Sequence, residues 1–154
     1  MRQEMLERHP QMSKIRRMVG GWEVDVTIDG PDGEHTTGKG RFIATGILRG
    51  NGIRGEMHVD VGGEPYELHD LWSFDLGEGK MHIMSVTTDG EAHDHVGEWR
   101  DDRTLVLRWE GTRDGKEAHE DMVITFASGN DIIARAEDFV DGRRSSVFEF
   151  RMRR

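Results

Sequence analysis

The chain has 154 residues, enough for one domain with a hydrophobic core, and its formal net charge is −9. This charge excludes nucleic acid as a partner, because no basic stripe can neutralise phosphates. The absence of cysteine excludes disulfides, a thiol nucleophile and thiolate metal sites. No apolar run approaches the roughly 18 residues of a membrane span, and the start lacks the apolar core of a secretion signal. We therefore expect a cytoplasmic protein without membrane partners.

Residues 1–19 are the stretch with helical periodicity. Met1 to Arg8 predicts a short helical turn, and Pro10 suits the first position of a second helix, where its missing N–H would be unpaired anyway. An apolar stripe recurs at helical spacing and consists of Met12, Ile15, Met18 and Val19. Gly20-Gly21 ends the helix. We expect the stripe to plug one end of the fold; the alternative is a partner-binding helix.

Residues 20–154 predict about ten short strands. The first alternates apolar and polar residues, with Trp22, Val24, Val26 and Ile28 on one face. Glycine turns follow at short intervals, among them Asp89-Gly90, Asp114-Gly115 and Asp141-Gly142. Because barrel closure removes exposed strand edges, this pattern favours an all-β, antiparallel up-and-down barrel with a short N-terminal helix, formed as a single domain over residues 1–154.

The strands between Pro65 and Phe126 can be paired through their turns, because side chains alternate between the two faces. The predicted register places Asp70 opposite Ser85, Ser85 opposite Asp94, Asp94 opposite Trp109, and Trp109 opposite Glu120. This row lies on the apolar face, which also carries Tyr66, Trp72 and Val96. Three carboxylates there would be costly to bury dry. The row therefore predicts a solvated or ligand-filled cavity, unless a register is wrong and the acids are on the surface.

The leading functional interpretation is binding of a small, partly apolar or aromatic ligand inside the barrel. The residues expected to contact it are Tyr66, Trp72, Ser85, Trp109, Glu120 and Arg135, the last placed inward with Glu137 and Ser146 by pairing Arg135 with Phe148. The alternative is an enzyme of the isomerase, hydratase or cyclase type. In that enzyme Asp70 and Asp94, roughly 10 Å apart at the backbone, would serve as acid and base. A structural network neutralised by Arg135 would explain the same residues.

Histidines define a third interpretation. His93 and His95 share one face of a strand, and His82 is diagonal to His95 on the neighbouring strand, which suits a divalent metal. The predicted register places all three outward, where they would form a solvated surface. If the register were inverted, they would line the cavity, and a metal enzyme would become the leading interpretation.

The same outward face carries large apolar residues, namely Leu71, Met84, Val86, Trp99, Val106 and Val123. Exposed apolar groups of this size often mark an interface. The pattern favours a homodimer or another interaction through Met84, Val86 and Trp99, against the alternative of scattered surface hydrophobes.

Short motifs add a resemblance. Gly20 and Trp22 match the Gly-x-Trp signature of lipocalin-like (calycin) barrels. Together with residues 46–50, Gly-Ile-Leu-Arg-Gly, and 72–75, Trp-Ser-Phe-Asp, they make the chain resemble a bacterial calycin-like family of uncharacterised function. The resemblance implies a barrel with an interior ligand site and with Arg144 or Arg151 packed on Trp22. It transfers no catalytic residue. Some small calycin barrels, the nitrobindins, bind haem through a histidine near the C-terminus; the last one here is His119, so we expect no haem and no other cofactor.

Overall fold

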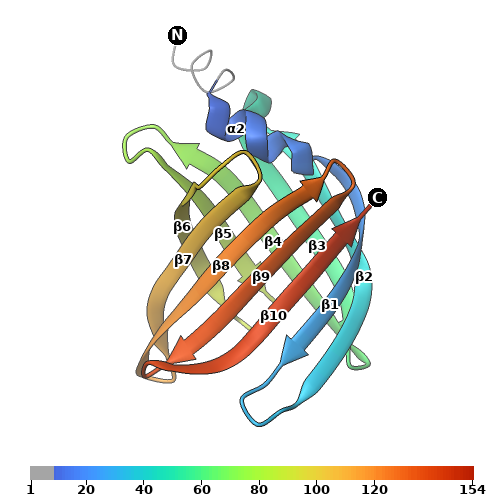
Figure 1. Ribbon diagram of the computed structural model, residues 1–154, viewed down its shortest axis with the longest axis vertical. Coiled ribbons are helices and arrows are strands. Elements are labelled where there is room, and N and C mark those ends of the chain that lie inside the picture. Colours follow the sequence, from blue (N-terminus) through green and yellow to red (C-terminus); the bar gives the residue numbers. More distant parts are fainter. Residues whose placement is uncertain (1–8) are drawn as a thin grey trace.

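The computed structural model describes residues 9–154, which form a closed barrel of ten antiparallel strands (Figure 1). The strands are β1 (Gly20–Asp29), β2 (His35–Ile47), β3 (Gly52–Val61), β4 (Glu64–Asp75), β5 (Lys80–Thr87), β6 (Ala92–Trp99), β7 (Thr104–Arg113), β8 (Lys116–Ser128), β9 (Asp131–Val140) and β10 (Arg143–Arg153). Each strand pairs with the next, and β10 pairs with β1 to complete the ring. The predicted fold class is confirmed.

A short helical segment covers one end of the barrel, which we call the closed end (Figure 1). It consists of α2 (Pro10–Ile15) and the 3₁₀ turn η1 (Arg16–Met18), and a second 3₁₀ turn, η2 (Leu48–Gly50), lies between β2 and β3. Three residues of the predicted stripe are fully buried: Met12, Ile15 and Met18. The prediction of a plug is therefore confirmed for these residues, whereas the predicted turn from Met1 to Arg8 lies outside the described residues.

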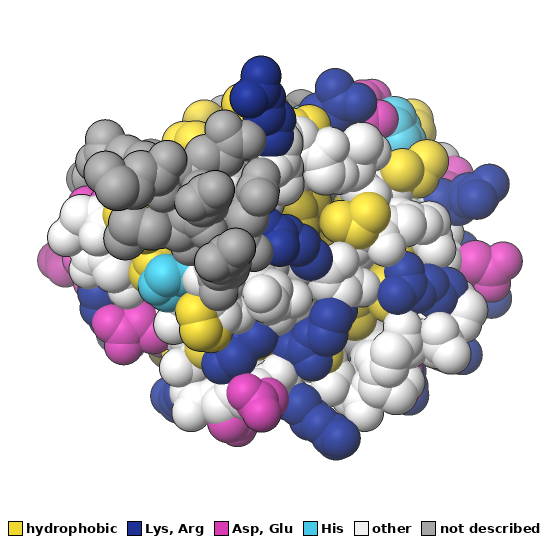
Figure 2. Space-filling model, turned by 90° about the horizontal axis from the view of Figure 1, so that it is seen from above, with side chains coloured by type: hydrophobic (Ala, Val, Ile, Leu, Met, Phe, Trp, Pro, Cys, Tyr) yellow, Lys and Arg dark blue, Asp and Glu magenta, His cyan; other side chains and the backbone are white. Residues whose placement is uncertain are grey.

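Trp22 anchors β1 to this plug. Its indole N–H donates to the Met18 carbonyl oxygen at 2.8 Å, and the Arg154 guanidinium lies 4.0 Å from the centre of its ring. The expectation that Arg144 or Arg151 packs on Trp22 was wrong, because these two side chains pair with Glu137 and Asp131. Seen from above in Figure 2, this end gathers Lys and Arg side chains.

The opposite end, the open end, is formed by the turns and short loops that follow β1, β3, β5, β7 and β9 (Figure 1). Inward-facing side chains there are less completely covered than at the closed end. Tyr66 of β4 and Phe150 of β10, for example, are only partly buried. No helix within residues 9–154 is long and apolar enough to cross a membrane.

The predicted register is correct at two hairpins and wrong at three. Asp70 pairs with Ser85 and Trp109 with Glu120, as expected. Ser85, however, pairs with His93 rather than Asp94, because the β5–β6 loop has three residues and not two. A left-handed Gly90 (φ 82°) ends this loop, as is usual for three-residue hairpins.

The β6–β7 loop also has three residues, since the Arg100 N–H donates to the Thr104 carbonyl oxygen. The Asp101 carboxylate stabilises this loop by accepting the N–H groups of Arg103 and Thr104. Val96 pairs with Arg108, so the register between β6 and β7 differs by one residue from the predicted pairing of Asp94 with Trp109. The two errors cancel beyond β6, so among the strands β4 to β8 only β6 was assigned to the wrong faces.

The third error concerns β9 and β10. The Asp141-Gly142 turn has the expected two residues, but a bulge between Arg144 and Ser146 shifts the register by one. Arg135 therefore pairs with Glu149 instead of Phe148. Arg135 and Glu137 form an ion pair on the outer surface at 3.2 Å, so their predicted inward placement was wrong.

The predicted apolar outer face is present only in part. Leu71, Met84 and Val86 are about half exposed, at 44%, 50% and 53%. Trp99 instead packs inward, with its ring 5.5 Å from that of Phe126, so its place on this face was wrong. A homodimer through the remaining residues stays a prediction.

Candidate functional site

The open half of the barrel contains a cavity of about 240 Å³. One side of it is mainly apolar and is formed by Tyr66, Leu68, Met122, Phe148 and Phe150. The other side is polar and includes Glu91, His93, His95, Arg113, Glu120 and Asp138. A second hollow of about 240 Å³ shares Tyr66 and Phe148 and lies at the turns of the open end. The arrangement offers an apolar surface and a hydrogen-bonding surface to one small molecule.

Four neighbouring strands, β6 to β9, bring the polar side together. His93 and His95 are two residues apart on β6, so both side chains lie on its inward face. Glu120 reaches His95 from β8. Ala136 of β9 faces the same space with a small side chain. Between β6 and β8, β7 pairs with β6 only from Val96 to Trp99. Because this backbone pairing is short, contacts between polar side chains also help to hold the strands of the open half together.

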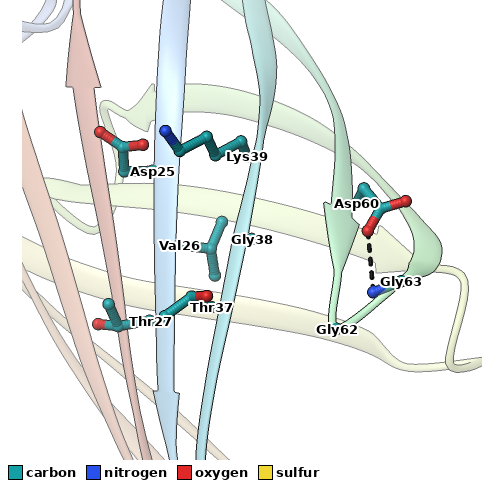
Figure 3. A pocket seen from close by; sticks show the side chains of 9 residues that line it. All are labelled: Asp25, Val26, Thr27, Thr37, Gly38, Lys39, Asp60, Gly62 and Gly63. Atoms are coloured by element: carbon teal, nitrogen blue, oxygen red, sulfur yellow. Dashed lines mark hydrogen bonds between the residues drawn. The ribbon is translucent and has the colours of Figure 1, made fainter.

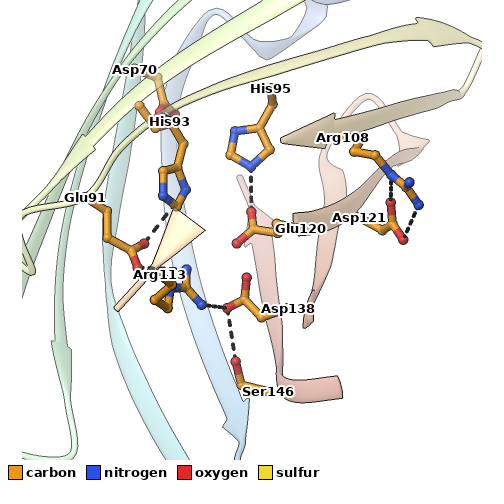
Figure 4. A network of polar contacts seen from close by, with 11 residues as sticks. Asp70, Glu91, His93, His95, Arg108, Arg113, Glu120, Asp121, Asp138 and Ser146 are labelled. Atoms are coloured by element: carbon orange, nitrogen blue, oxygen red, sulfur yellow. Dashed lines mark hydrogen bonds and ion pairs between the residues drawn. The ribbon is translucent and has the colours of Figure 1, made fainter. Parts of the chain in front are cut away.

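The central contact of this side joins His95 and Glu120 (Figure 4). The His95 Nε2 lies 2.6 Å from Glu120 Oε1, and the two residues are only 2% and 8% exposed. Burial by itself raises the pKa of Glu120, but hydrogen bonds with His95 and Asp138 outweigh it and hold the pKa below its usual value. Glu120 is therefore ionised although it is buried.

Asp138 extends the contact toward the open end. It accepts a hydrogen bond from Ser146 Oγ at 3.1 Å, and Arg113 Nη1 lies 3.4 Å away (Figure 4). Arg113 also donates to Glu91 Oε1 at 2.8 Å. Burial, reinforced by the neighbouring Glu120, raises the pKa of Asp138 to about 6. The two adjacent carboxyl groups thus favour different protonation states, as expected for acids that share one site.

His93 is held from the β7 side. Its ring stacks on Trp109, with 3.6 Å between ring centres and 14° between ring planes. Its Nδ1 faces Glu91 Oε2 at 3.9 Å. Burial lowers the pKa of His93, so the ring is neutral at pH 7. Trp109 therefore supports the polar side from behind instead of facing the cavity directly.

Asp70 lies next to the cavity, at the level of Ser85. Ser85 Oγ donates to Asp70 Oδ1 at 2.5 Å, and burial raises the pKa of Asp70 to about 6. Asp94, in contrast, is on the outer surface, 3.1 Å from His82 Nδ1. The two residues proposed as an acid–base pair therefore lie on opposite faces of the sheet, and their predicted convergence was wrong.

The other predicted contact residues divide between the cavity, the core and the surface. Tyr66, Ser85 and Glu120 line the cavity, and burial raises the pKa of Tyr66 to about 12. Trp72 is buried in the hydrophobic core, 5% exposed. Arg135 is on the outer surface.

Sequence reasoning also missed residues of the site. It did not find Arg113 or Asp138, and it assigned the two inward histidines to the outside. A three-residue β5–β6 loop was the one signal that would have placed the histidines, and nothing in the sequence marks the bulge that shifts β10.

The predicted histidine cluster is divided by the barrel wall. His82 is outside, between Glu78 at 2.8 Å and Asp94, whereas His93 and His95 are inside. Within residues 9–154, two groups bring three possible metal ligands within 4.8 Å of one another. The inner group is His93, His95 and Glu120; the outer group is His58, Glu67 and His69.

A hollow on the outer surface is a weaker candidate (Figure 3). It measures about 570 Å³ and lies along β1 and β2 near the β3–β4 turn. Its charged side chains do not form one cluster, because Asp60 lies apart from Asp25 and Lys39, and Asp60 already accepts the Gly63 N–H at 2.9 Å. The interior cavity is therefore the candidate site.

No family model and no curated protein matches this chain. Among solved structures, it is similar to the S-type phycobiliprotein lyase CPES from Guillardia theta, with a TM-score of 0.64 and 12% identity over 98% of this chain and 96% of that one. Two further structures have TM-scores below one half. EF1p2_mFAP2b bound to DFHBI has a TM-score of 0.45 at 12% identity, covering 94% of this chain and 98% of that one. A de novo designed fluorescence-activating β-barrel has a TM-score of 0.44 at 11% identity, covering 90% of this chain and 94% of that one. At this identity the likeness to the lyase shows a shared barrel fold.

Proposed function

We propose that the protein binds a small, partly aromatic ligand in the cavity of the open half. The observation that carries this proposal is the two-sided lining, with Tyr66, Phe148 and Phe150 facing a hydrogen-bonded polar side. The Gly20-x-Trp22 motif, with Trp22 sealing the closed end, supports placing the chain among the lipocalin-like (calycin) barrels. One structural neighbour is named a phycobiliprotein lyase, and we take from it the fold alone.

Unsatisfied polar atoms support a bound ligand. His95 Nδ1 and Thr87 Oγ1 are buried and have no hydrogen-bond partner among the described residues, and both residues line the cavity. A buried polar atom without a partner costs roughly 1–3 kcal/mol. A ligand or an ordered water that pairs with these atoms would recover part of this free energy.

The charge of the lining indicates the class of ligand. It includes four carboxyl side chains, those of Asp89, Glu91, Glu120 and Asp138, against the single guanidinium of Arg113. Such a lining favours neutral or cationic molecules over anionic ones. The volume of about 240 Å³ suits one or two fused rings with a short polar substituent.

Three indoles with the same ring and different charge test the proposal. Tryptamine is cationic at pH 7, indole is neutral and indole-3-acetate is anionic. We expect saturation-transfer NMR and calorimetry to rank their affinities in that order, because the ring meets the apolar side and the substituent meets the carboxyl groups.

A matched pair of variants locates the binding. Ala136 faces the cavity and Arg135, its neighbour on β9, faces solvent. Ala136→Leu should fill the cavity and weaken tryptamine binding at least tenfold, whereas Arg135→Leu should leave it unchanged. Equal effects of the two variants, or no binding of any indole, would contradict the proposal.

A further inference from the structure

We propose that His93, His95 and Glu120 bind a divalent transition-metal ion, of which zinc is the model case, on the polar side of the cavity. This inference goes beyond the proposed function and does not depend on the binding of an organic ligand. The three candidate ligand atoms lie within 4.8 Å of one another, inside the barrel and at the cavity wall. Small rotations of the side chains would bring each ligand atom to roughly 2.0–2.2 Å from a shared zinc ion, as zinc coordination requires.

The chemistry of the three ligands selects the metal. Two imidazoles and one carboxylate suit zinc and the neighbouring first-row metals, whereas magnesium and calcium prefer an all-oxygen set. Three protein ligands leave at least one coordination position open. Because all three side chains line the cavity, that position would face the space in which an organic ligand or water can bind.

The surroundings of the histidines resemble the outer shell of a metal site. Glu91 lies at 3.9 Å from His93 Nδ1 and can orient the ring so that Nε2 faces inward (Figure 4). Trp109 stacks on the same ring and restricts its rotation. A carboxylate that orients a ligating imidazole is a usual part of histidine metal sites.

His95 supplies an independent observation. The residue is 2% exposed, its Nε2 is paired with Glu120, and its Nδ1 is buried without any partner among the described residues. A purely structural histidine in such a position would be expected to use both ring nitrogens. A metal ion bound by His95 Nε2 and Glu120 would make Nδ1 an N–H donor, which water or an organic ligand in the cavity can accept.

The charge balance of the inner site also favours a cation. Arg113 is already engaged by Glu91 and Asp138. Its ion-pair partners are these two carboxyl groups, whereas Glu120 is hydrogen-bonded to His95. A divalent ion would offset the excess of carboxyl groups in a place that water reaches poorly, where electrostatic interactions are stronger than at the surface.

The outer group of His58, Glu67 and His69 provides a built-in control. It has the same residue types, but its side chains are about half exposed, at 59%, 49% and 43%. Metal binding there would have to compete with water for exposed side chains. We therefore assign the metal to the inner group.

The experiment is a zinc titration of chelator-treated protein, followed by calorimetry and by metal analysis after gel filtration, without any organic ligand. We expect equimolar zinc to remain on the wild-type chain. His95→Gln and Glu120→Gln should each lower the affinity by at least roughly 100-fold, since even outer-shell partners are worth about 10- to 100-fold. His69→Gln should leave stoichiometry and affinity unchanged.

Cobalt provides a second readout that does not depend on affinity. Cobalt(II) in the inner site should give visible absorption bands and quench the fluorescence of Trp109, which stacks on His93. Trp109→Phe should remove most of the quenching and retain the bands. Circular dichroism of each variant checks its fold, and His93→Gln replaces any variant that does not fold.

Three outcomes would overturn the assignment: no zinc retained by the folded wild type, loss of binding in His69→Gln, or unchanged binding in folded His95→Gln and His93→Gln. None of them bears on the binding of indoles, which is measured with Ala136→Leu on metal-free protein.

Discussion

The two ends of the barrel are built from different chemistry. At the closed end, Met12, Ile15 and Met18 are completely buried beneath a short helix, and Trp22 connects that helix to β1. At the open end, the inward positions carry histidines, carboxyl groups and an arginine beside a cavity. The difference indicates that stability and binding are located in opposite halves of one barrel, so that mutations should separate them.

The two halves differ in the free energy of burying their side chains. Apolar side chains at the closed end gain stability in proportion to the surface that they bury. The buried acids at the open end lose hydration and regain only part of it through hydrogen bonds, as the raised pKa values of Asp70 and Asp138 show. A polar cavity that lowers stability is expected where a site has to receive a ligand.

The largest expected effect is at the closed end. Trp22→Ala removes a side chain that is 1% exposed, together with its hydrogen bond to Met18, and should lower the free energy of unfolding by about 3–5 kcal/mol. Trp109→Ala, which truncates a partly buried ring at the open end, should cost clearly less. Urea unfolding followed by circular dichroism measures both. An equal loss in the two variants would contradict the division between the halves.

The next effect is a dependence of stability on pH that originates at the open end. The folded-state pKa of Asp70 is about 6, above the value of about 4 expected in the unfolded chain. The folded state therefore binds the proton more tightly, and the free energy of unfolding should fall as the pH rises from about 4 to about 6. For one group the full difference is about 3 kcal/mol.

Asp70→Asn should flatten this part of the profile, because the amide does not ionise, while Asp138 should leave a residual slope in the same range. Asp32→Asn, in the exposed loop between β1 and β2, is the control and should leave the slope unchanged. Unfolding in urea at several pH values gives the profile. A wild-type free energy of unfolding that is flat or rises between pH 4 and 6 would show that the folded-state pKa of Asp70 is not raised.

The same division separates what the sequence could predict from what it could not. The plug was predictable because Met12, Ile15 and Met18 follow the helical period and Gly20-Gly21 ends it. Alternation and glycine turns were sufficient for the ten strands and for closure. These signals are repeated over many residues, so a single misjudged position does not change the conclusion.

The site depended on single residues in turns. Thr88-Asp89-Gly90 closes a three-residue loop, and a two-residue loop centred on Asp89-Gly90 was equally compatible with the sequence. This one-residue difference reverses the faces of β6, and with them His93 and His95. Arg135 was misplaced by a bulge after Arg144 that has no clear sequence signature. Trp109 and Glu120 were paired correctly because the Asp114-Gly115 turn has the expected two residues. They were placed on the correct face because the errors on the two sides of β6 cancelled.

The smallest expected effect concerns the seal of the closed end. The Arg154 guanidinium lies over the Trp22 ring and donates to the carbonyl oxygens of Val19 and Arg17. Because the side chain is exposed to water, Arg154→Ala should lower the free energy of unfolding by only about 1 kcal/mol. It should leave the binding of tryptamine at the open end unchanged.

Arg144→Ala and Arg151→Ala are the matched controls, because each removes an arginine of β10 that forms a surface ion pair away from Trp22. Exposed ion pairs contribute little, so both variants should lie within about 0.5 kcal/mol of the wild type. Chemical unfolding of the three variants side by side resolves the difference. If Arg151→Ala or Arg144→Ala were as destabilising as Arg154→Ala, the contact with Trp22 would add nothing beyond an ordinary surface charge, and the closed end would owe its stability to the buried apolar side chains alone.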